Sequence, residues 1–581
     1  MIQQQLSMEV LKLKKDAEEM YEEARAYREN TLRPKWEEAH RAFVGKHWHG
    51  KRIPKWKRKI VFNEVRRVVR QHLPLLTDNN PIMSVFGRGP EDTQTAKLLD
   101  DLMKYYWERL HISVRKAMAT YDALIFAVGW LKPYIDSRAN NGLGDLALDV
   151  IDPWHVLMDP NSSWKGVPYE AVLNAEFVIH EHLVSPRELK QRYPDKAEVI
   201  DAATFAGRED YAPWTQRDYL SHGYQHRRIE TLALTGDPTK KQQIYTDYTP
   251  LNPYEPGRLL VKEVYMRGAN GPMVITLCED LVLKVRPDPE GVDGGYPFDH
   301  GRIPLLPLVV NPIPGQLYGD GVTEDIYEIN KYLNKAWQLI ETQQQIYQGP
   351  PVFAEEGSLS ESGAAWSPGA VNWVEPGRIG GVLVPPLPPI PPDRFQTIDK
   401  CSQYIDKISG TTESISGRRL PAGTSGVAVE AVMESALTRI RMMERFNAPV
   451  YNEMGRQMIS ILQQTFNDTG VIYHVLGERG EGQDPFNAIQ PGDLGGWFDF
   501  ILVPQAAHGL IQQIRFKQAM DMRAQNIQIR DERVIDYSEV PDKEAIKNEI
   551  KADRESELQM LREKVAQMEQ GGPPPQPGGP M

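Results

Sequence analysis

Cysteine is nearly absent from this chain of 581 residues, which contains only Cys278 and Cys401. The two are far apart and neither belongs to a CxxC pair. The sequence therefore excludes a disulfide framework and a cysteine-based metal site. We expect both thiols to be inert.

Long apolar runs are also missing. No stretch of about 18 apolar residues could span a bilayer, and the N-terminus MIQQQLSMEVLKLKKDAEEM has charged residues where a secretory signal needs apolar ones. With 41% hydrophobic and 25% charged residues, the composition predicts a soluble globular protein that folds in the cytosol without membrane contact. The length predicts about four domain-sized units.

The common catalytic and nucleotide-binding motifs are absent as well. The Gly-Lys pairs at 45–46 and 50–51 are followed by His and Arg, so there is no phosphate-binding GxxxxGK[ST] loop. HExxH, GxSxG and a GxGxxG after a strand are missing too. His47 and His49 form an HxH pair with no further ligand nearby, so no metal site is predicted there. We expect no enzymatic activity and no cofactor.

The chain has no excess of positive charge. Its formal net charge is −12, which argues against a protein that coats nucleic acid, so any DNA contact must be local. A local exception is the basic stretch, residues 46–59, which holds seven Lys or Arg, no acid, and Trp48 and Trp56. It can bind phosphate and stack on bases, or be a solvated linker or a patch for an acidic protein. Its candidate patch residues are Lys55, Lys57, Arg58 and Lys59.

From residue 61 to about 310, strand-like and helix-like segments alternate. An amphipathic helix is predicted near 93–126, and strands are predicted in GWLKPYID, LALDVIDPWHVLMDP, VLNAEFVIHEHLV, LVKEVYMRG and MVITLCEDLVLKV. Before this body, residues 1–45 indicate one or two amphipathic helices broken near Pro34. The prediction is an α+β domain with the largest core of the chain.

Two helices with narrow apolar seams follow. The first runs from Val322 to about Gln348, about 40 Å, and the second ends at Gly410. The seam residues are Val322, Ile326, Ile329, Leu333, Ala336 and Ile340 in the first helix, and Phe395, Ile398, Cys401, Ile405 and Ile408 in the second. A narrow seam suits packing against one neighbour, although an ordinary surface helix has the same pattern.

The segment between these helices, residues 349–392, is rich in Gly, Pro and Ser. It contains the short strand-like pieces PVFAEE, AVNWVEP and GGVLVPP and ends in PPLPPIPP. Six prolines in eight residues favour a stiff polyproline II strut, and a PxxP ligand for another domain has the same appearance.

The loop after the second helix contains ISGRRLPAGTSGVAV, residues 415–429. A helix of about 40 residues begins around Ser425, and Pro449 inside its apolar pattern predicts a bend. VIYHVLG and WFDFILV are predicted to form a returning strand pair. Residues 508–570 are predicted to be helical, and GGPPPQPGGPM to be a disordered tail.

The order of these segments resembles the portal, or head-to-tail connector, proteins of tailed bacteriophages. The resemblance covers roughly residues 60–560, and its specificity comes from joint order rather than from one strict signature. Its carriers are NEVRRVVRQHLPLLTDNNPIMSVFGR, DALIFAVGWLKPYID followed by VIDPWHVLMDP, GDGVTEDIYEINKYLNKAWQLI, and SGTTESISGRRLPAGTSGVAVEAV.

Portal subunits have wing, stem, clip and crown regions and form rings, typically of twelve. The resemblance therefore implies an α+β portal-like subunit divided as follows: 1–60 N-terminal helices and basic stretch, 61–319 wing, 320–348 stem helix, 349–392 small α/β clip, 393–410 return stem helix, 411–426 tunnel loop, 427–507 kinked helix and wing strands, 508–570 helical crown, and 571–581 tail.

The resemblance also implies a function. The ring would form a channel at one capsid vertex, through which double-stranded DNA is packaged and later ejected. Its partners would be further copies of the chain, the terminase, the major capsid protein or scaffold, and tail adaptor proteins. It would be assembled in the host cytoplasm and end in the virion. The alternatives are another head-completion or ejection protein without a channel, or a phage nuclease.

The resemblance places the tunnel loop in the channel. Gly417, Gly423 and Gly426 would let it flex, and Arg418 and Arg419 would touch DNA phosphates transiently while the negative charge elsewhere favours sliding. The alternative is that the two arginines pair with acids of a neighbouring subunit. The residues implied for stem packing are Ile326, Ile329, Leu333, Ile340, Ile398 and Ile405.

Overall fold

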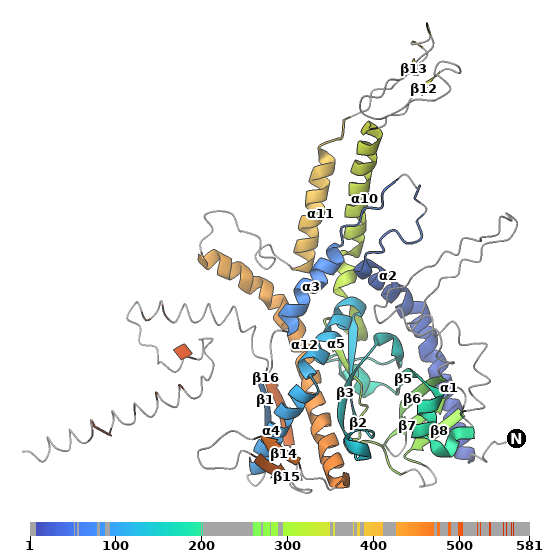
Figure 1. Ribbon diagram of the computed structural model, residues 1–581, viewed down its shortest axis with the longest axis vertical. Coiled ribbons are helices and arrows are strands. Elements are labelled where there is room, and N and C mark those ends of the chain that lie inside the picture. The colour runs from blue at the N-terminus through green and yellow to red at the C-terminus, as the bar shows by residue number, and fades with distance from the viewer. Residues whose placement is uncertain are drawn as a thin grey trace, which may run out of the picture. The chain divides into compact units, whose positions relative to one another are not determined.

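The computed structural model is a mixed structure of helices and antiparallel sheets (Figure 1), as the α+β prediction requires. It describes residues 7–51, 53–54, 57–77, 82–87, 93–198, 200, 259–268, 271–278, 281–288, 294–348, 353–354, 376, 380, 382–383, 389–410, 426–469, 473–476, 486–489, 498–503 and isolated positions between 520 and 562. The chain divides into two compact units, Met1–Ser425 with Ala431–Pro504, and Gly426–Glu430 with Gln505–Met581. The contacts described below lie within the first unit.

The N-terminal segment forms two α-helices, where one or two were predicted, and the second begins at Arg33, next to Pro34. Helix α1 (Met8–Tyr27) begins at Ser7, whose Oγ accepts the Val10 N–H, and a π-helical turn (Arg28–Leu32) leads into α2 (Arg33–Val44). Proline fits the first turn of a helix because its missing N–H has no intrahelical partner there. Arg28, in the π-helical turn, forms a buried ion pair with Glu181. This pair fastens the N-terminal helices to the sheet that contains Glu181.

Two sheets form the body. One has the order β3-β2-β9 and the other β4-β5-β6-β7-β8, and all their neighbouring strands are antiparallel. The strands are β2 (Val128–Asp136), β3 (Asp145–Ile151), β4 (Val156–Met158), β5 (Phe177–Val184), β6 (Leu259–Gly268), β7 (Gly271–Cys278), β8 (Leu281–Arg286) and β9 (Leu306–Val309). They fall within the predicted apolar segments, except β9, for which no strand was specified.

The predicted single helix near 93–126 is wrong in one respect. The structure has two helices there, α4 (Thr93–Arg109) and α5 (Ile112–Phe126), and they are separated at Leu110 and His111. His111 has a φ of 49°, a left-handed conformation that cannot continue a right-handed helix. The apolar pattern runs through this break, which explains the error. Helix α3 (Glu64–Thr77) packs against α5.

The predicted pairing of VIYHVLG with WFDFILV is also wrong. WFDFILV forms β16 (Phe498–Val503), which pairs with β1 (Ile82–Gly87), whereas VIYHVLG forms β14 (Tyr473–Leu476), which pairs with β15 (Phe486–Ile489). A local hairpin costs less loop entropy than a distant pairing, so β14 takes the strand that follows it closely. β16 pairs with a strand more than 400 residues earlier in the chain.

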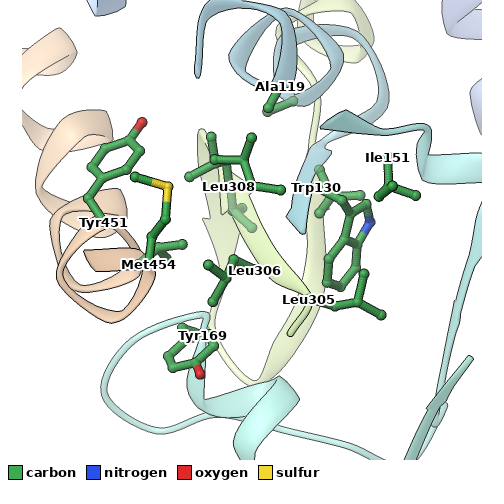
Figure 2. Packing of buried hydrophobic residues seen from close by; sticks show 14 of the residues in the cluster. Ala119, Trp130, Ile151, Tyr169, Leu305, Leu306, Leu308, Tyr451 and Met454 are labelled. Atoms are coloured by element: carbon green, nitrogen blue, oxygen red, sulfur yellow. The ribbon is translucent and has the colours of Figure 1, made fainter. Parts of the chain in front are cut away.

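The main core lies between the three-stranded sheet and a long helix, α12 (Gly426–Thr469). Figure 2 shows Leu306 and Leu308 of β9 between Trp130 of β2 and the α12 side chains Tyr451 and Met454. All five belong to one buried cluster, and each buried side chain of this size contributes roughly 1.5–3 kcal/mol. α12 also makes a polar contact here, because Asn447 Oδ1 accepts the Val309 N–H at 2.9 Å.

Helix α12 contains Pro449 in its interior and is 44 residues long. Figure 1 shows that its axis changes direction along its length, as expected where a proline removes an intrahelical hydrogen bond. Small elements complete the fold: α6 (Glu170–Asn174), α7 (Pro186–Arg192), β10 (Asn311–Ile313) and β11 (Gln316–Asp320). Among the described residues, no helix is long and apolar enough to cross a membrane.

Candidate functional site

Helix α10 (Val322–Gln348) begins inside the core of the body. Val322 and Ile326 are fully buried there, and the Thr323 hydroxyl donates to the Ile125 carbonyl oxygen at 3.0 Å. The preceding residue is Gly321, where a Cβ would stand only 2.8 Å from that same carbonyl. The start of this helix is therefore fixed to the end of α5.

Helix α11 (Asp393–Ser409) returns along α10, and the two lie side by side (Figure 1). Two of the predicted seam residues of the second helix, Phe395 and Ile408, are exposed instead. The residues predicted for stem packing divide between two clusters. Leu333, Ile340 and Ile398 pack together with Cys401, whereas Ile326 and Ile405 are buried in the main core. Ile329 is partly buried and packs against both clusters. The seam thus joins the two helices to each other and, at one end, to the body.

The body holds α11 at its C-terminal end. Gly410 ends the helix with a φ of 74°, and Arg439 of α12 donates to the Ile408 carbonyl oxygen. Arg439 also lies 3.6 Å from the Asp325 carboxylate of α10, measured from Nη2 to Oδ2. One guanidinium of α12 therefore contacts both helices of the pair near the body.

The far ends of the two helices are joined by residues 349–392, of which the structure describes a short strand pair. Phe353 of β12 (Phe353–Ala354) is opposite Leu383 of β13 (Val382–Leu383). These strands fall in the predicted pieces PVFAEE and GGVLVPP. The piece AVNWVEP lies almost wholly outside the described residues, as does the first half of the polyproline strut, residues 385–388.

The basic stretch lies against α10, which sequence reasoning did not foresee. Asn334 Oδ1 accepts the Phe62 N–H at 2.8 Å, Asn330 Nδ2 donates to the Phe62 carbonyl oxygen at 2.9 Å, and Asn334 Nδ2 lies 2.8 Å from His47 Nδ1. His47 Nε2 contacts the Ala42 carbonyl oxygen at 3.0 Å. Nε2 must therefore carry the proton and Nδ1 must accept. Burial lowers the pKa of His47, which favours this neutral form.

The candidate patch residues are only partly described. Arg58 and Lys59 are exposed, Lys57 is partly buried, and Lys55 lies outside the described residues. Arg58 lies 3.7 Å from Glu341 of α10 and is 78% exposed, so this pair contributes little to stability. A signal for the contact was present in the sequence, because Asn330, Asn334, Gln338 and Glu341 form a polar stripe at helical spacing.

The start of α10 also carries a perturbed carboxyl group. Burial, opposed by Lys35 and reinforced by the neighbouring Asp320, raises the pKa of Glu324 to about 7. Lys35 Nζ of α2 lies 3.9 Å from Glu324 Oε2. Glu324 therefore changes charge near neutral pH at the point where α10 leaves the body.

The tunnel loop itself lies outside the described residues. Arg418, Arg419, Gly417 and Gly423 belong to residues 411–425, whereas Gly426 is the first residue of α12. The loop connects α11, after Gly410, to α12. Most of residues 508–570 and all of 571–581 also fall outside the described part of the chain.

At this site, two paired helices are held to the body at one end by Arg439, and a short strand pair lies in the segment that joins their other ends. No curated protein matches the sequence. The family model described as phage P22-like portal protein matches residues 18–578, nearly the whole chain. This chain therefore belongs to the phage P22-like portal protein family.

Proposed function

We propose that copies of this chain form a ring, of twelve subunits, whose central channel carries double-stranded DNA into and out of the capsid. Membership of the portal family supports the role in the DNA channel. The ring and its subunit number rest on what the family resemblance implies and on the surface of the helix pair.

The observation that supports ring formation is the apolar surface that stays exposed on α10 and α11. Their seam is filled, yet Tyr332, Leu339, Phe395 and Tyr404 are 56%, 46%, 45% and 56% exposed. Large apolar side chains that are exposed on two adjacent helices indicate protein contacts. A ring with repeated head-to-tail contacts would bury this surface against the next copy of the same helix pair.

In this arrangement, residues 61–319 form the wing, the helix pair is the stem, and residues 349–392 form the clip that docks the terminase during packaging and the tail adaptor afterwards. Residues 508–570 form the crown. The subunit carries no phosphate-binding loop, so the terminase supplies the energy of packaging. The capsid protein or scaffold contacts the wing, and assembly takes place in the host cytoplasm before the ring enters the virion.

The tunnel loop, residues 411–426, would extend from the stem toward the channel. There Arg418 and Arg419 would meet the phosphates, and Gly417 and Gly423 would allow the loop to move with the passing duplex. The loop follows directly after the end of α11 that Arg439 fastens to the body. This supports a loop that moves while its base stays in place.

The experiment is cryo-electron microscopy of the purified full-length chain, which should give closed rings with a central hole and twelvefold symmetry. Tyr332→Glu should abolish ring formation, because it places a charge in the subunit contact. Leu143→Glu, at a residue that is 51% exposed on the loop between β2 and β3, is the matched control and should form normal rings. Monomers or filaments of the unaltered chain would contradict the proposal.

A second measurement tests the role of the tunnel loop separately from ring formation. Rings carrying Arg418→Ala and Arg419→Ala should assemble normally but translocate DNA more slowly in a packaging assay with terminase. If these rings package DNA at the normal rate but dissociate more readily, the arginines pair with a neighbouring subunit instead.

A further inference from the structure

Three side chains that can bind a metal ion meet on the five-stranded sheet, away from the stem. His180 and His182 are two residues apart on β5, so both point to the same face. Glu263 of β6 is directly opposite His180 in the strand register. One nitrogen of each imidazole and one carboxylate oxygen lie within 4.8 Å of one another.

One of these groups is buried without a partner. His182 Nδ1 is inaccessible to solvent and has no hydrogen-bond partner among the residues that the structure describes. Its ring stacks on that of His180, with centroids 4.9 Å apart. A buried polar nitrogen is costly unless something binds it, and a ligand bound to His182 would remove this cost.

A cation already lies against the other two groups. Lys132 Nζ of β2 is 3.1 Å from His180 Nδ1 and forms an ion pair with Glu263 Oε2. The imidazole nitrogen and the carboxylate oxygen therefore act as acceptors for a positive charge in this position. The Tyr265 hydroxyl donates to the same carboxylate oxygen at 3.0 Å, which fixes the orientation of the carboxylate as partners of metal ligands do.

We propose that His180, His182 and Glu263 form a binding site for a divalent transition-metal ion of the zinc class, in competition with the Lys132 ammonium group. Two imidazoles and one carboxylate are a ligand set that zinc accepts, with a fourth position left for water. Bonds of about 2.0–2.2 Å require the ligand atoms to approach by on the order of 1 Å, within the range of side-chain rotation. The ion would displace Lys132 and so loosen the link between β2 and the five-stranded sheet.

The test uses the full-length chain, freed of metal by a chelator and without an affinity tag. Zn²⁺ binding is measured by competition with a chromophoric chelator, and Co²⁺ is used as a second probe whose visible absorption reports its ligands. The chain should bind one ion. His182→Gln and His180→Gln should each weaken binding at least about tenfold. The control His111→Asn, which keeps the left-handed conformation at that residue, should leave binding unchanged.

Lys132→Met is expected to have the opposite effect on the affinity for Zn²⁺. A gain in affinity cannot come from a variant that fails to fold, so this variant keeps the test decisive. Removing the competing charge should tighten Zn²⁺ binding by at least about tenfold, since a unit charge a few ångströms from the ion opposes it strongly. Failure of both the unaltered chain and Lys132→Met to take up one Zn²⁺ ion overturns the proposal. Uptake that His182→Gln does not weaken overturns it too. These measurements do not depend on ring formation or packaging, so they test this site separately from the proposed function.

Discussion

Arg67 of α3 and Asp406 of α11 form an ion pair in which Arg67 Nη2 donates to Asp406 Oδ1 at 2.6 Å. The two residues are 339 positions apart in the chain. The same guanidinium contacts Glu64 and donates to Gln71 on its own helix, which holds it in position. The pair therefore connects α11 to α3, a helix of the body.

Asp406→Asn should lower the free energy of unfolding by about 1 kcal/mol, because the pair is only partly buried and charge-assisted. A double-mutant cycle with Arg67→Met, followed by denaturant unfolding, isolates the interaction. Asp399→Asn, at an exposed residue of the same helix, should have no effect. A coupling free energy near zero would show that the pair does not stabilise the attachment of α11.

Asn334→Ala should release the basic stretch from α10. The change leaves the Phe62 N–H without its acceptor and takes the donor from His47, at a cost of about 1–3 kcal/mol for a buried group. Limited trypsin digestion should then cleave faster at residues 57–59. Gln344→Ala, at an exposed residue of the same helix, serves as the comparison. Equal cleavage rates in both variants would mean that Asn334 does not hold the stretch.

The stability difference between Glu324→Gln and the unaltered chain should depend on pH. Burial raises the pKa of Glu324 to about 7, above its ordinary value of 4.5, so the folded state binds the proton more tightly than the unfolded state. Ionisation therefore destabilises the fold, progressively from about pH 4.5 up to about pH 7. Glu324→Gln cannot ionise, so it does not lose stability in this way. It should become more stable than the unaltered chain as the pH rises through this window. Thermal unfolding at pH 5 and pH 8 measures it.

Glu328→Gln is the control for this pH dependence. Glu328 lies one turn further along α10 with a side chain that is 78% exposed. Its substitution should shift the melting temperature equally at both pH values. A Glu324→Gln curve parallel to that of the unaltered chain would contradict the raised pKa.

Gly129→Ala should prevent correct folding. A Cβ at this position of β2 would overlap the carbonyl oxygen of Ala119 in α5, and backbone atoms on both sides cannot move without breaking the core. We expect a loss of more than about 3 kcal/mol, seen as insoluble protein on expression. Gly295→Ala is the matched control, because a Cβ there meets no atom within 4 Å. Similar yields of both variants would disprove the close contact.

The helix pair could be predicted because its signal is repetitive. Over the 27 residues of α10, every apolar residue of the seam fits the same helical period, so each one supports the prediction of a helix. Gly410 alone marks the end of α11. The break at His111 could not be seen, because a single left-handed residue leaves the apolar period intact. The pairing of β1 with β16 could not be seen either, since partners more than 400 residues apart share no local pattern.

The metal-ligand candidates show what sequence reasoning can and cannot reach. The motif HEH at residues 180–182 lies inside a predicted strand. Because side chains alternate between the two faces of a strand, the sequence alone places both imidazole rings on one face. Its third member, Glu263, became visible only when the register of β5 and β6 was known. His47 and His49 have the same HxH spacing, but His47 contacts Asn334 of α10. The roles of Arg418 and Arg419 remain predictions.

The contact between Asn447 and Val309 has a consequence for self-association. β9 is the last strand of its sheet, and the outer edge of such a strand offers free N–H groups on alternate residues, to which a strand of another molecule can add. At Val309 the side-chain amide of Asn447 already occupies that N–H. Two residues earlier, Pro307 has none to offer. In the proposed ring, neighbouring copies would therefore be unable to add strands along this border and would meet through their helices instead.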